Sequence, residues 1–281
     1  MKYKFFLILI IIPLAALFFM PAFSGSNFLR LIFFDVGQGD ASLIILPDGR
    51  KILIDGGPDN QVLLGLGKYL NFFDRNLDLL ILSHEHDDHL FGLVQVIKRY
   101  RIGKIIHAAS YCKNNLCQEF FETAKKQNIK IEEINSQQKI IFAPDCILDL
   151  YPPKNLLAKN INNRSIAFRL DCFGAKILLA GDGELAREEE LLSESNDLTA
   201  TIFKASHHGS NTSNSENLIK KINPSLIIIP VGAENNFKHP ASSTLERFES
   251  LGIKYFRTDK NGNISLKFLG KTYPQLTIDK E

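Results

Sequence analysis

The chain has very little net charge for its length. Its 33 basic and 31 acidic residues leave a formal charge of +2 over 281 residues, and the pI is near 8.2. A dedicated nucleic-acid binder usually has a strongly basic footprint. This balance therefore excludes a protein that holds polyanions through its overall field. Any preference for an anionic substrate must come from the local geometry of a site.

Several familiar catalytic and architectural signals are also missing. No Ser or Cys stands in a recognisable nucleophile elbow, and the sequence contains no internal repeat or low-complexity linker. The Gly-Gln-Gly-Asp string at 37–40 is followed by a predicted strand rather than a helix. It therefore lacks the context of a dinucleotide-binding loop.

Only four cysteines are present, and they fall into two groups. Cys112 and Cys117 lie in a polar stretch, where they are predicted to close a small surface disulfide in an oxidising compartment. A zinc knuckle would need a second pair of ligands of this kind. Cys146 and Cys172 lie in apolar runs and are predicted to be small buried hydrophobic residues.

Charge is absent from residues 5–29, which follow Lys2 and Lys4, and the part up to Phe23 is almost wholly apolar. Residues 1–28 are interpreted as a cleaved signal peptide or as an uncleaved membrane anchor, and we favour the anchor. A buried core helix is the third interpretation. Because basic residues stay on the cytoplasmic side, residues 29–281 are expected outside the cytoplasmic membrane, either anchored or secreted.

Short strands and helices alternate irregularly through residues 29–281, which are expected to form one hydrolase domain. An antiparallel meander is predicted to open this region, and hairpins occur at both ends. Such a pattern predicts an α/β fold with two mixed sheets covered by helices, a four-layer αββα sandwich with its metal-binding loops at one edge. The predicted strands are 30–36, 41–46, 51–55, 77–83, 105–109, 129–134, 139–142, 147–151, 165–172, 176–180, 200–206, 225–231, 254–258 and 263–268, and the predicted helices are 61–73, 90–100, 117–128, 184–193, 216–222 and 242–251.

The most informative segment is His-Glu-His-Asp-Asp-His at 84–89, directly after a predicted buried strand. His84 and His86 leave the strand on the same side and can share one cation. Asp88 and His89 follow a turn later and can hold a second. Imidazole and carboxylate ligands suit zinc, and also manganese or iron. Two such ions about 3.5–4 Å apart activate one water molecule and clamp a phosphoryl or acyl oxygen.

Three further ligand-type residues follow apolar strands. Asp182 comes directly after one such strand and is predicted to bridge the two metals, the alternative being a helix N-cap. His207 and His208 end another strand and are expected to leave it in opposite directions. We prefer His208 as the metal ligand and His207 as a proton donor or a contact to the substrate. Ser210 and the backbone after Gly209 are expected to bind a phosphate oxygen.

The loop at 235–240 contains amides, a cation and a histidine. Asn236, Lys238 and His239 are predicted to hold an anionic leaving group, and the alternative is a plain polar loop.

Asp55 ends a predicted strand and is expected to orient His84 or His86 through a hydrogen bond, as most ligating histidines require. His107 is the one histidine outside these motifs and is predicted to be structural.

Taken in order, these motifs resemble the metallo-β-lactamase superfamily and, more narrowly, the C-terminal domain of ComEC, the DNA-uptake channel of competent bacteria. The resemblance covers about residues 29–270. It implies an αββα fold, a bound metal pair and a nuclease that degrades the strand that is not imported. The matching motifs are Asp-Val-Gly-Gln-Gly-Asp at 35–40, Ser-His-Glu-His-Asp-Asp-His at 83–89, Asn-Arg-Ser at 163–165, Gly-Asp at 181–182, Ser-His-His-Gly-Ser at 206–210 and His-Pro at 239–240.

Two features depart from the family pattern. One N-terminal segment stands in place of the large transmembrane region, so we expect a separate DNA-uptake channel as a partner. The usual third histidine of the first metal is missing as well, and Asn163 or Ser165 occupies that region. The first metal would then be held by His84, His86, bridging Asp182 and water, a site that suits manganese as well as zinc.

The sequence therefore predicts a membrane-anchored hydrolase with two divalent metal ions, zinc or manganese, that cuts phosphodiester bonds, most readily those of DNA. Asp88, His207 and His239 are predicted to be its catalytic residues. Two alternatives stay open: a hydrolase of a small phosphoester or an acyl substrate, and a non-catalytic DNA-binding module.

Overall fold

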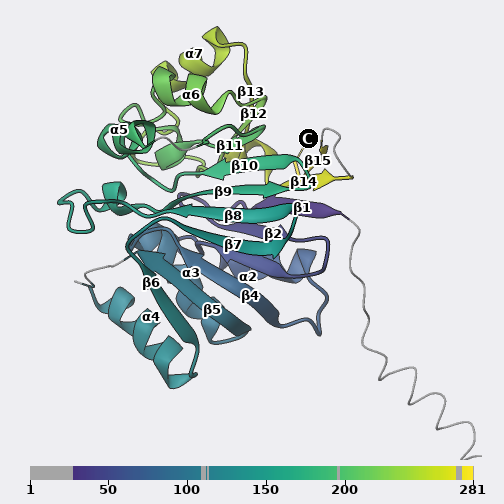
Figure 1. The fold of residues 1–281 in the computed structure, drawn as a ribbon. Helices are drawn as coiled ribbons and strands as arrows, with labels where there is room; N and C mark the ends of the chain where they lie inside the picture. Colours follow the sequence, from purple (N-terminus) through teal and green to yellow (C-terminus); the bar gives the residue numbers. More distant parts are fainter. Residues whose placement is uncertain (1–27, 109–111, 113, 195–196, 270–273, 281) are drawn as a thin grey trace, which may run out of the picture.

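The computed structural model describes residues 28–280, except 109–111, 113, 195–196 and 270–273. The predicted signal peptide or membrane anchor, residues 1–28, thus lies outside the described residues apart from Phe28. Within the described ranges, no helix combines the length and the apolarity that crossing a bilayer requires. Two sheets pack face to face, and helices cover their outer faces (Figure 1).

The first sheet contains eight strands in the order β15-β14-β1-β2-β3-β4-β5-β6. Its first three strands in the chain form the predicted antiparallel meander. From β3 to β6 the strands are parallel, because a helix returns the chain to the same edge after each one. The bounds are β1 Leu29–Phe33, β2 Ser42–Ile45, β3 Lys51–Ile54, α2 Gln61–Tyr69, β4 Asn76–Leu82, α3 Asp87–Ile97, β5 Arg101–Ala108, α4 Asn115–Lys126, β6 Lys130–Ile134, β14 Ile264–Phe268 and β15 Gln275–Ile278.

The second sheet contains seven strands in the order β13-β12-β11-β10-β9-β8-β7. Strands β7 to β10 are antiparallel neighbours, and β10 to β13 are parallel. The bounds are β7 Gln138–Ala143, β8 Cys146–Tyr151, β9 Ala167–Cys172, β10 Ala175–Leu179, α5 Leu185–Ser193, β11 Ile202–Lys204, α6 Glu216–Ile222, β12 Leu226–Ile229, α7 Ser242–Ser250 and β13 Lys254–Arg257.

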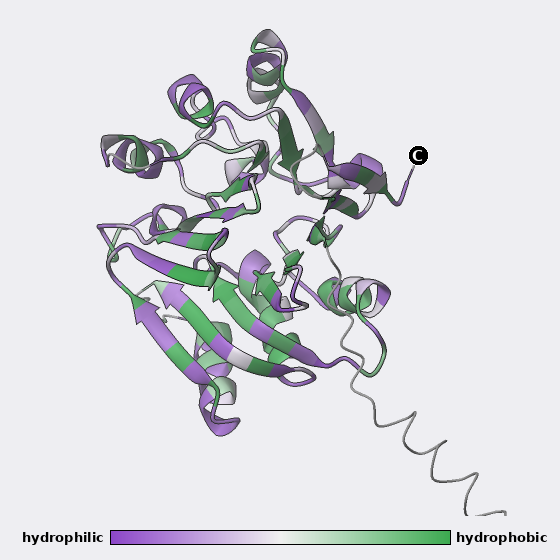
Figure 2. Ribbon diagram, turned by 45° about the vertical axis from the view of Figure 1, so that its right-hand side comes forward, coloured by the Kyte–Doolittle hydropathy of each residue, from purple (hydrophilic) through white to green (hydrophobic). Residues whose placement is uncertain are grey.

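The apolar residues divide among three layers of packing. One cluster fills the space between the two sheets, a second lies between the first sheet and α2, α3 and α4, and a third lies between the second sheet and α5, α6 and α7. Figure 2 shows apolar stretches along the strands with polar residues between them, and the outer helices also carry both kinds of residue. The predicted four-layer αββα sandwich is confirmed.

Every predicted strand and helix is present, with bounds that shift by a few residues. The sequence pattern did not predict β15 or the short helices α8 (Thr258–Asn261), η1 (Ile161–Arg164) and η2 (Ser206–Gly209). Strand β15 pairs with β14 at the edge of the sheet and is mostly exposed, so it lacks the alternation of a half-buried strand.

Both cysteine pairs form disulfides. The predicted bond between Cys112 and Cys117 is present. Cys146 and Cys172 are buried, as predicted, but they are also bonded to each other, which the sequence did not predict. The two residues lie directly opposite each other on β8 and β9, a register that sequence periodicity does not reveal.

Candidate metal centre

The histidine-rich segment at 83–89 leads from the end of β4 into the first turn of α3. Its start is fixed by Asp55, whose Oδ1 accepts a hydrogen bond of 2.8 Å from the Ser83 backbone. The Ser83 hydroxyl then pairs with Nδ1 of His84 at 3.0 Å. The helix begins at Asp87, three residues earlier than predicted, so Asp88 belongs to its first turn.

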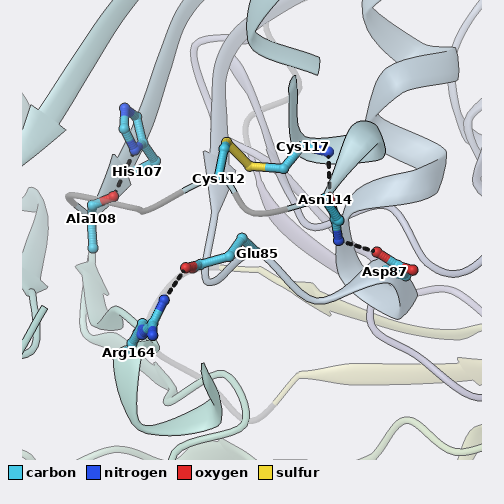
Figure 3. The surroundings of a disulfide bond; sticks show 8 residues. All are labelled: Glu85, Asp87, His107, Ala108, Cys112, Asn114, Cys117 and Arg164. Carbon is cyan, nitrogen blue, oxygen red and sulfur yellow. Dashed lines mark hydrogen bonds and ion pairs between the residues drawn. A yellow bond between two sulfur atoms is a disulfide. The ribbon is translucent and has the colours of Figure 1, made fainter. Parts of the chain in front are cut away.

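Two polar contacts brace this segment from outside (Figure 3). Glu85 forms a buried ion pair with Arg164 of η1 at 2.6 Å. Asn114 donates to Asp87 at 2.9 Å and accepts from the Cys117 backbone at 2.8 Å. The Cys112–Cys117 disulfide is therefore linked to the metal-binding segment through Asn114, which contacts both the Cys117 backbone and Asp87.

Four predicted ligands converge from three separate places in the chain. Asp88, His89, Asp182 and His208 each offer an atom to a group whose members lie within 4.8 Å of one another. Oδ2 of Asp182 lies 3.2 Å from Nε2 of His89 and 3.3 Å from Nε2 of His208. Oδ2 of Asp88 lies 3.4 Å from the same atom of His208. Three of the four residues are buried, so the cluster is a desolvated pocket of carboxylate and imidazole.

The hydrogen bonds of the imidazoles test whether this cluster suits a cation. Nδ1 of His89 bonds to Asp55 at 2.9 Å, and Nδ1 of His208 bonds to the Pro230 carbonyl at 3.0 Å. Their Nε2 atoms, like Nε2 of His84, are buried and have no hydrogen-bond partner among the described residues. A buried nitrogen left in this way needs a ligand, and anchoring of the other ring nitrogen is the usual arrangement in metal sites. The donor set therefore fits a divalent metal ion.

Asp55 was predicted to orient His84 or His86 through a hydrogen bond, but its side chain bonds to His89 instead. The difference follows from α3: its early start turns His89 back toward the end of β3, where Asp55 lies.

Two residues of this centre were missed from the sequence. Lys204, at the end of β11, is 2% exposed; its Nζ donates to the Gly181 carbonyl at 2.9 Å, lies 3.4 Å from Oδ1 of Asp182 and contacts Asp40. Asp40 also lies 3.4 Å from Nδ1 of His208. A signal was present, since Asp40 closes one of the quoted motifs and Lys204 is a charge within an apolar strand.

This geometry agrees with the comparisons with known proteins. The family model of the metallo-beta-lactamase superfamily matches residues 34–230. This chain belongs to the metallo-beta-lactamase superfamily.

Among curated proteins, the chain is similar to two competence-related proteins. It is 26% identical over 269 residues to ComE operon protein 3 of Bacillus subtilis (strain 168), covering 90% of this chain and 34% of that protein. It is 29% identical over 248 residues to competence protein ComA of Neisseria gonorrhoeae, covering 87% and 33%. The chain thus spans about a third of the length of these relatives.

Among solved structures, the metallo-beta-lactamase fold protein YhfI from Bacillus subtilis matches with a TM-score of 0.60 at 12% identity, covering 85% of this chain and 100% of that one. Igni18, a metallo hydrolase from Ignicoccus hospitalis, matches with a TM-score of 0.56 at 16% identity, with the same coverage. At these identities the two structures support the fold of this metallo-beta-lactamase domain and nothing finer.

The charged groups in the centre of this metallo-beta-lactamase domain shift one another's pKa values. Burial by itself raises the pKa of Asp182, but His208, His89 and Lys204 together hold that pKa well below its usual value. Burial likewise acts to lower the pKa of His89, yet Asp182, Asp88 and Asp55 raise it well above its usual value. In the metal-free centre the carboxylates are therefore ionised and His89 is protonated. A divalent cation can replace the proton on the ligating nitrogen.

His84 differs from its neighbours. Burial first, and then the proximity of His89, lower its pKa well below the usual value, so His84 is neutral at pH 7. Its ring centroid lies 4.2 Å from that of His89 and 5.4 Å from that of His86. The side chain of His86 is 46% exposed. These two histidines thus lie beside the four-residue group, His84 buried and His86 on the solvent side.

An open pocket of about 500 Å³ gives access to this centre, and both His207 and His239 line it. The two imidazoles of the pair at 207–208 do not diverge as strand neighbours would. Strand β11 ends before them, their backbone has left-handed φ values of 48° and 52°, and both line the pocket. His208, rather than His207, belongs to the four-residue group.

The environments of His207 and His239 keep both rings neutral. Asn162 contacts Nε2 of His207 at 3.3 Å, and Glu184 lies 3.5 Å from its Nδ1. Burial lowers the pKa of His207, and it lowers that of His239 to about 4. The two rings lie 5.2 Å apart.

Asn163 and Ser165 support the backbone around Asp182. The Ser165 hydroxyl accepts from the Asp182 backbone at 3.0 Å, and Asn163 accepts from the Glu184 backbone at 3.0 Å. Asn163 and Ser165 therefore hold the turn that carries the predicted metal ligand Asp182.

Three other predicted contacts lie further from the metal cluster. Ser210 is buried, and its hydroxyl pairs with Thr212 at 3.0 Å, so the structure turns it away from the pocket lining. Asn236 and Lys238 are exposed beside the pocket but are not among its lining residues. His107 is buried and contacts the Ala108 carbonyl at 2.6 Å, which agrees with a structural role.

Proposed function

We propose that this chain is a metal-dependent phosphodiesterase that cleaves DNA on the outer side of the cytoplasmic membrane. The observation that carries the proposal is the convergence of Asp88, His89, Asp182 and His208 at the base of a pocket open to solvent. The names of the competence proteins that the chain resembles support DNA as the substrate class.

Two divalent ions, zinc or manganese, are the cofactors that this donor set suits. When bound, they supply Lewis-acid chemistry, activating a water molecule and offsetting charge on the phosphoryl group. One ion would be held by His84, His86 and Asp182, and the other by Asp88, His89, Asp182 and His208.

The protein's own residues orient this centre and the substrate. Asp55 and Pro230 hold the rings of His89 and His208 so that Nε2 points inward. His207 and His239 are neutral at pH 7, so each offers one N–H to the leaving oxygen.

An aromatic side chain at the rim of the pocket also favours a nucleic acid. Phe237 is 68% exposed, and its ring lies nearly parallel to that of His239, with centroids 5.9 Å apart and an interplanar angle of 20°. Asn235 braces the loop by donating to the carbonyls of Gly232 and His239. A rigidly held ring beside a phosphate-binding centre suits stacking with a nucleobase.

The proposed placement outside the cytoplasm is supported by two disulfides, which persist in oxidising compartments, and by the apolar run near the N-terminus. The names of the similar competence proteins bear on the partner as well: we further propose a separate DNA-uptake channel.

The test combines metal analysis of the purified chain with cleavage of single- and double-stranded DNA in zinc, manganese or magnesium. Asp88→Ala should reduce turnover by about 100-fold or more while the circular dichroism spectrum stays unchanged, because the substitution removes a ligand from a partly exposed helix start. Full nuclease activity in Asp88→Ala would refute the mechanism.

A small phosphoester or an acyl compound is the competing substrate class, and salt separates it from DNA. Affinity for DNA should fall steeply as salt rises, while a small ester should show a shallow dependence. DNA binding without metal-dependent hydrolysis of any phosphoester would instead favour an accessory DNA-binding module.

A further inference from the structure

At the end of the first sheet opposite the metal centre, two adjacent phenylalanines point into solvent. Phe72 and Phe73, between α2 and β4, are 73% and 88% exposed. Their rings make an edge-to-face pair with centroids 5.2 Å apart. Asn71 holds this turn, accepting from the Phe73 backbone at 3.1 Å. Adjacent exposed aromatic residues held in this way indicate a contact surface rather than scattered surface apolarity.

Basic residues lie near the two rings, and one of them contacts the Phe72 ring. The segments 71–75 and 98–101 together contain four basic side chains and one acidic side chain. Arg75 lies over the Phe72 ring at 5.4 Å, and Arg101 donates its backbone N–H to the Arg75 carbonyl at 2.7 Å. Arg99 and Arg101 are exposed. The surface therefore combines apolar tips with cations, which suits an anionic phospholipid headgroup layer.

The strand pairing places this surface at the end of the first sheet where β1 begins. β1 is antiparallel to β2, β2 is antiparallel to β3, and β3 is parallel to β4, so β1 and β4 begin at the same end of the sheet. Three strand spacings separate them, about 14 Å. The described chain therefore enters the first sheet at Leu29, at the end of the sheet where Phe72 and Phe73 precede β4.

The metal centre lies at the other end. Asp55 and His84 follow the last residues of β3 and β4, and the seven residues of β4 separate the two ends by roughly 20 Å.

We propose that the surface formed by residues 71–75 and 98–101 rests on an anionic lipid bilayer, with Phe72 and Phe73 in the headgroup region. The metal pocket then faces away from the membrane, open to a polyanion arriving from outside. The proposal concerns orientation, and it holds or fails independently of the hydrolytic activity.

Because the chain contains no tryptophan, a single introduced one reports its own surroundings. Phe73→Trp is made in the full chain, which is incorporated into vesicles of phosphatidylglycerol and phosphatidylcholine with brominated acyl chains. We expect a blue shift of the emission and the loss of about half its intensity, since tryptophan settles at the membrane interface. Replacing Arg99 and Arg101 by Gln in the same variant should weaken the quenching in the anionic vesicles.

Phe237→Trp is the matched control, because Phe237 is also an exposed phenylalanine but lies at the metal end. Its emission should stay unshifted in the same vesicles. Phe72→Trp serves as a second reporter if Phe73→Trp does not fold. Three results would overturn the proposal: emission of both tip variants unchanged in vesicles, equal quenching at both ends, or a shift produced by DNA and not by lipid.

Discussion

Asp182 uses its two carboxylate oxygens for different partners. Oδ2 faces the Nε2 atoms of His89 and His208, while Oδ1 faces the ammonium of Lys204. Lys204 also contacts Asp40, so one buried cation holds two buried carboxylates in place. This arrangement orients the free oxygen of Asp182 toward the site where a metal would be bound.

Removing that cation tests its role. Lys204→Met should destabilise the metal-free protein by about 3 kcal/mol, because it leaves two buried carboxylates without their shared partner. Saturating manganese should restore part of the loss, since a cation then returns to the cluster. Urea unfolding with and without metal measures both effects. Lys220→Met, at an exposed helical pair, is the control and should change neither value. Equal stability of Lys204→Met and the parent chain would contradict this account.

The same residues make metal binding depend on pH. The pKa values of His89 and His208 are raised well above the usual value by Asp182 and its neighbours, despite burial. Both rings are therefore in the charged imidazolium form at neutral pH in the metal-free protein. A metal must displace the proton from the nitrogen that it binds. Metal affinity should rise with pH, with protons released on binding. Calorimetry at pH 6, 7 and 8 in buffers of different ionisation enthalpy measures both quantities. An affinity independent of pH would show that the imidazoles are already neutral.

At the scale of elements, the two disulfides lie in different settings. Cys146–Cys172 joins neighbouring strands β8 and β9 across 26 residues of sequence, and Cys112–Cys117 closes a segment of five before and within α4. The first bond stabilises the second sheet. The second lies next to Asn114, which holds Asp87 at the start of α3.

The two disulfides are expected to contribute different amounts to the free energy of unfolding. Replacing Cys146 and Cys172 by Ala should cost about 3 kcal/mol, and replacing Cys112 and Cys117 about 2 kcal/mol, because the longer loop regains more entropy on unfolding. The second pair should also weaken metal affinity, since it loosens Asn114 and thereby Asp87. Chemical unfolding and metal titration of both double variants measure this. Unchanged metal affinity after loss of Cys112 and Cys117 would separate that disulfide from the centre.

At the scale of the whole molecule, the metal centre joins the two sheets. Asp88 and His89 belong to the helix that follows β4 of the first sheet, while Asp182 and His208 follow β10 and β11 of the second. Helices cover both outer faces (Figure 1), so the ligands lie at an edge of the sandwich where strands of both sheets end. A cation bound there connects the two halves of the molecule.

Chelation should therefore lower the stability of the whole domain. With free metal at 100 times its Kd, binding adds about 2.7 kcal/mol to the free energy of unfolding. Thermal unfolding should show a higher Tm with manganese or zinc than with EDTA, and Asp88→Ala should reduce that difference. An identical Tm in metal and in EDTA would mean that the ligands do not hold a cation in the folded state.

Much of this protein follows from local patterns. The strands and helices, the four-layer sandwich and the segment at 84–89 could be predicted because each depends on residues close together in the chain. Asp182 could be singled out for the same reason, as a carboxylate directly after an apolar strand. A short exposed strand such as β15 has no such pattern, and only its pairing with β14 defines it.

The remaining features depend on which strands become neighbours. The bond between Cys146 and Cys172 requires the register of β8 against β9, and the role of Asp55 depends on where α3 turns His89. Lys204 ends a strand of the second sheet and Asp40 lies in the loop before β2 of the first, so their contact exists only once the two sheets have packed. The sequence by itself determined the chemical type of the ligands and their positions at strand ends. The tertiary structure alone decided which atoms meet. A charged group buried between the sheets is stable only when it is paired, and here its partner lies far away in the chain.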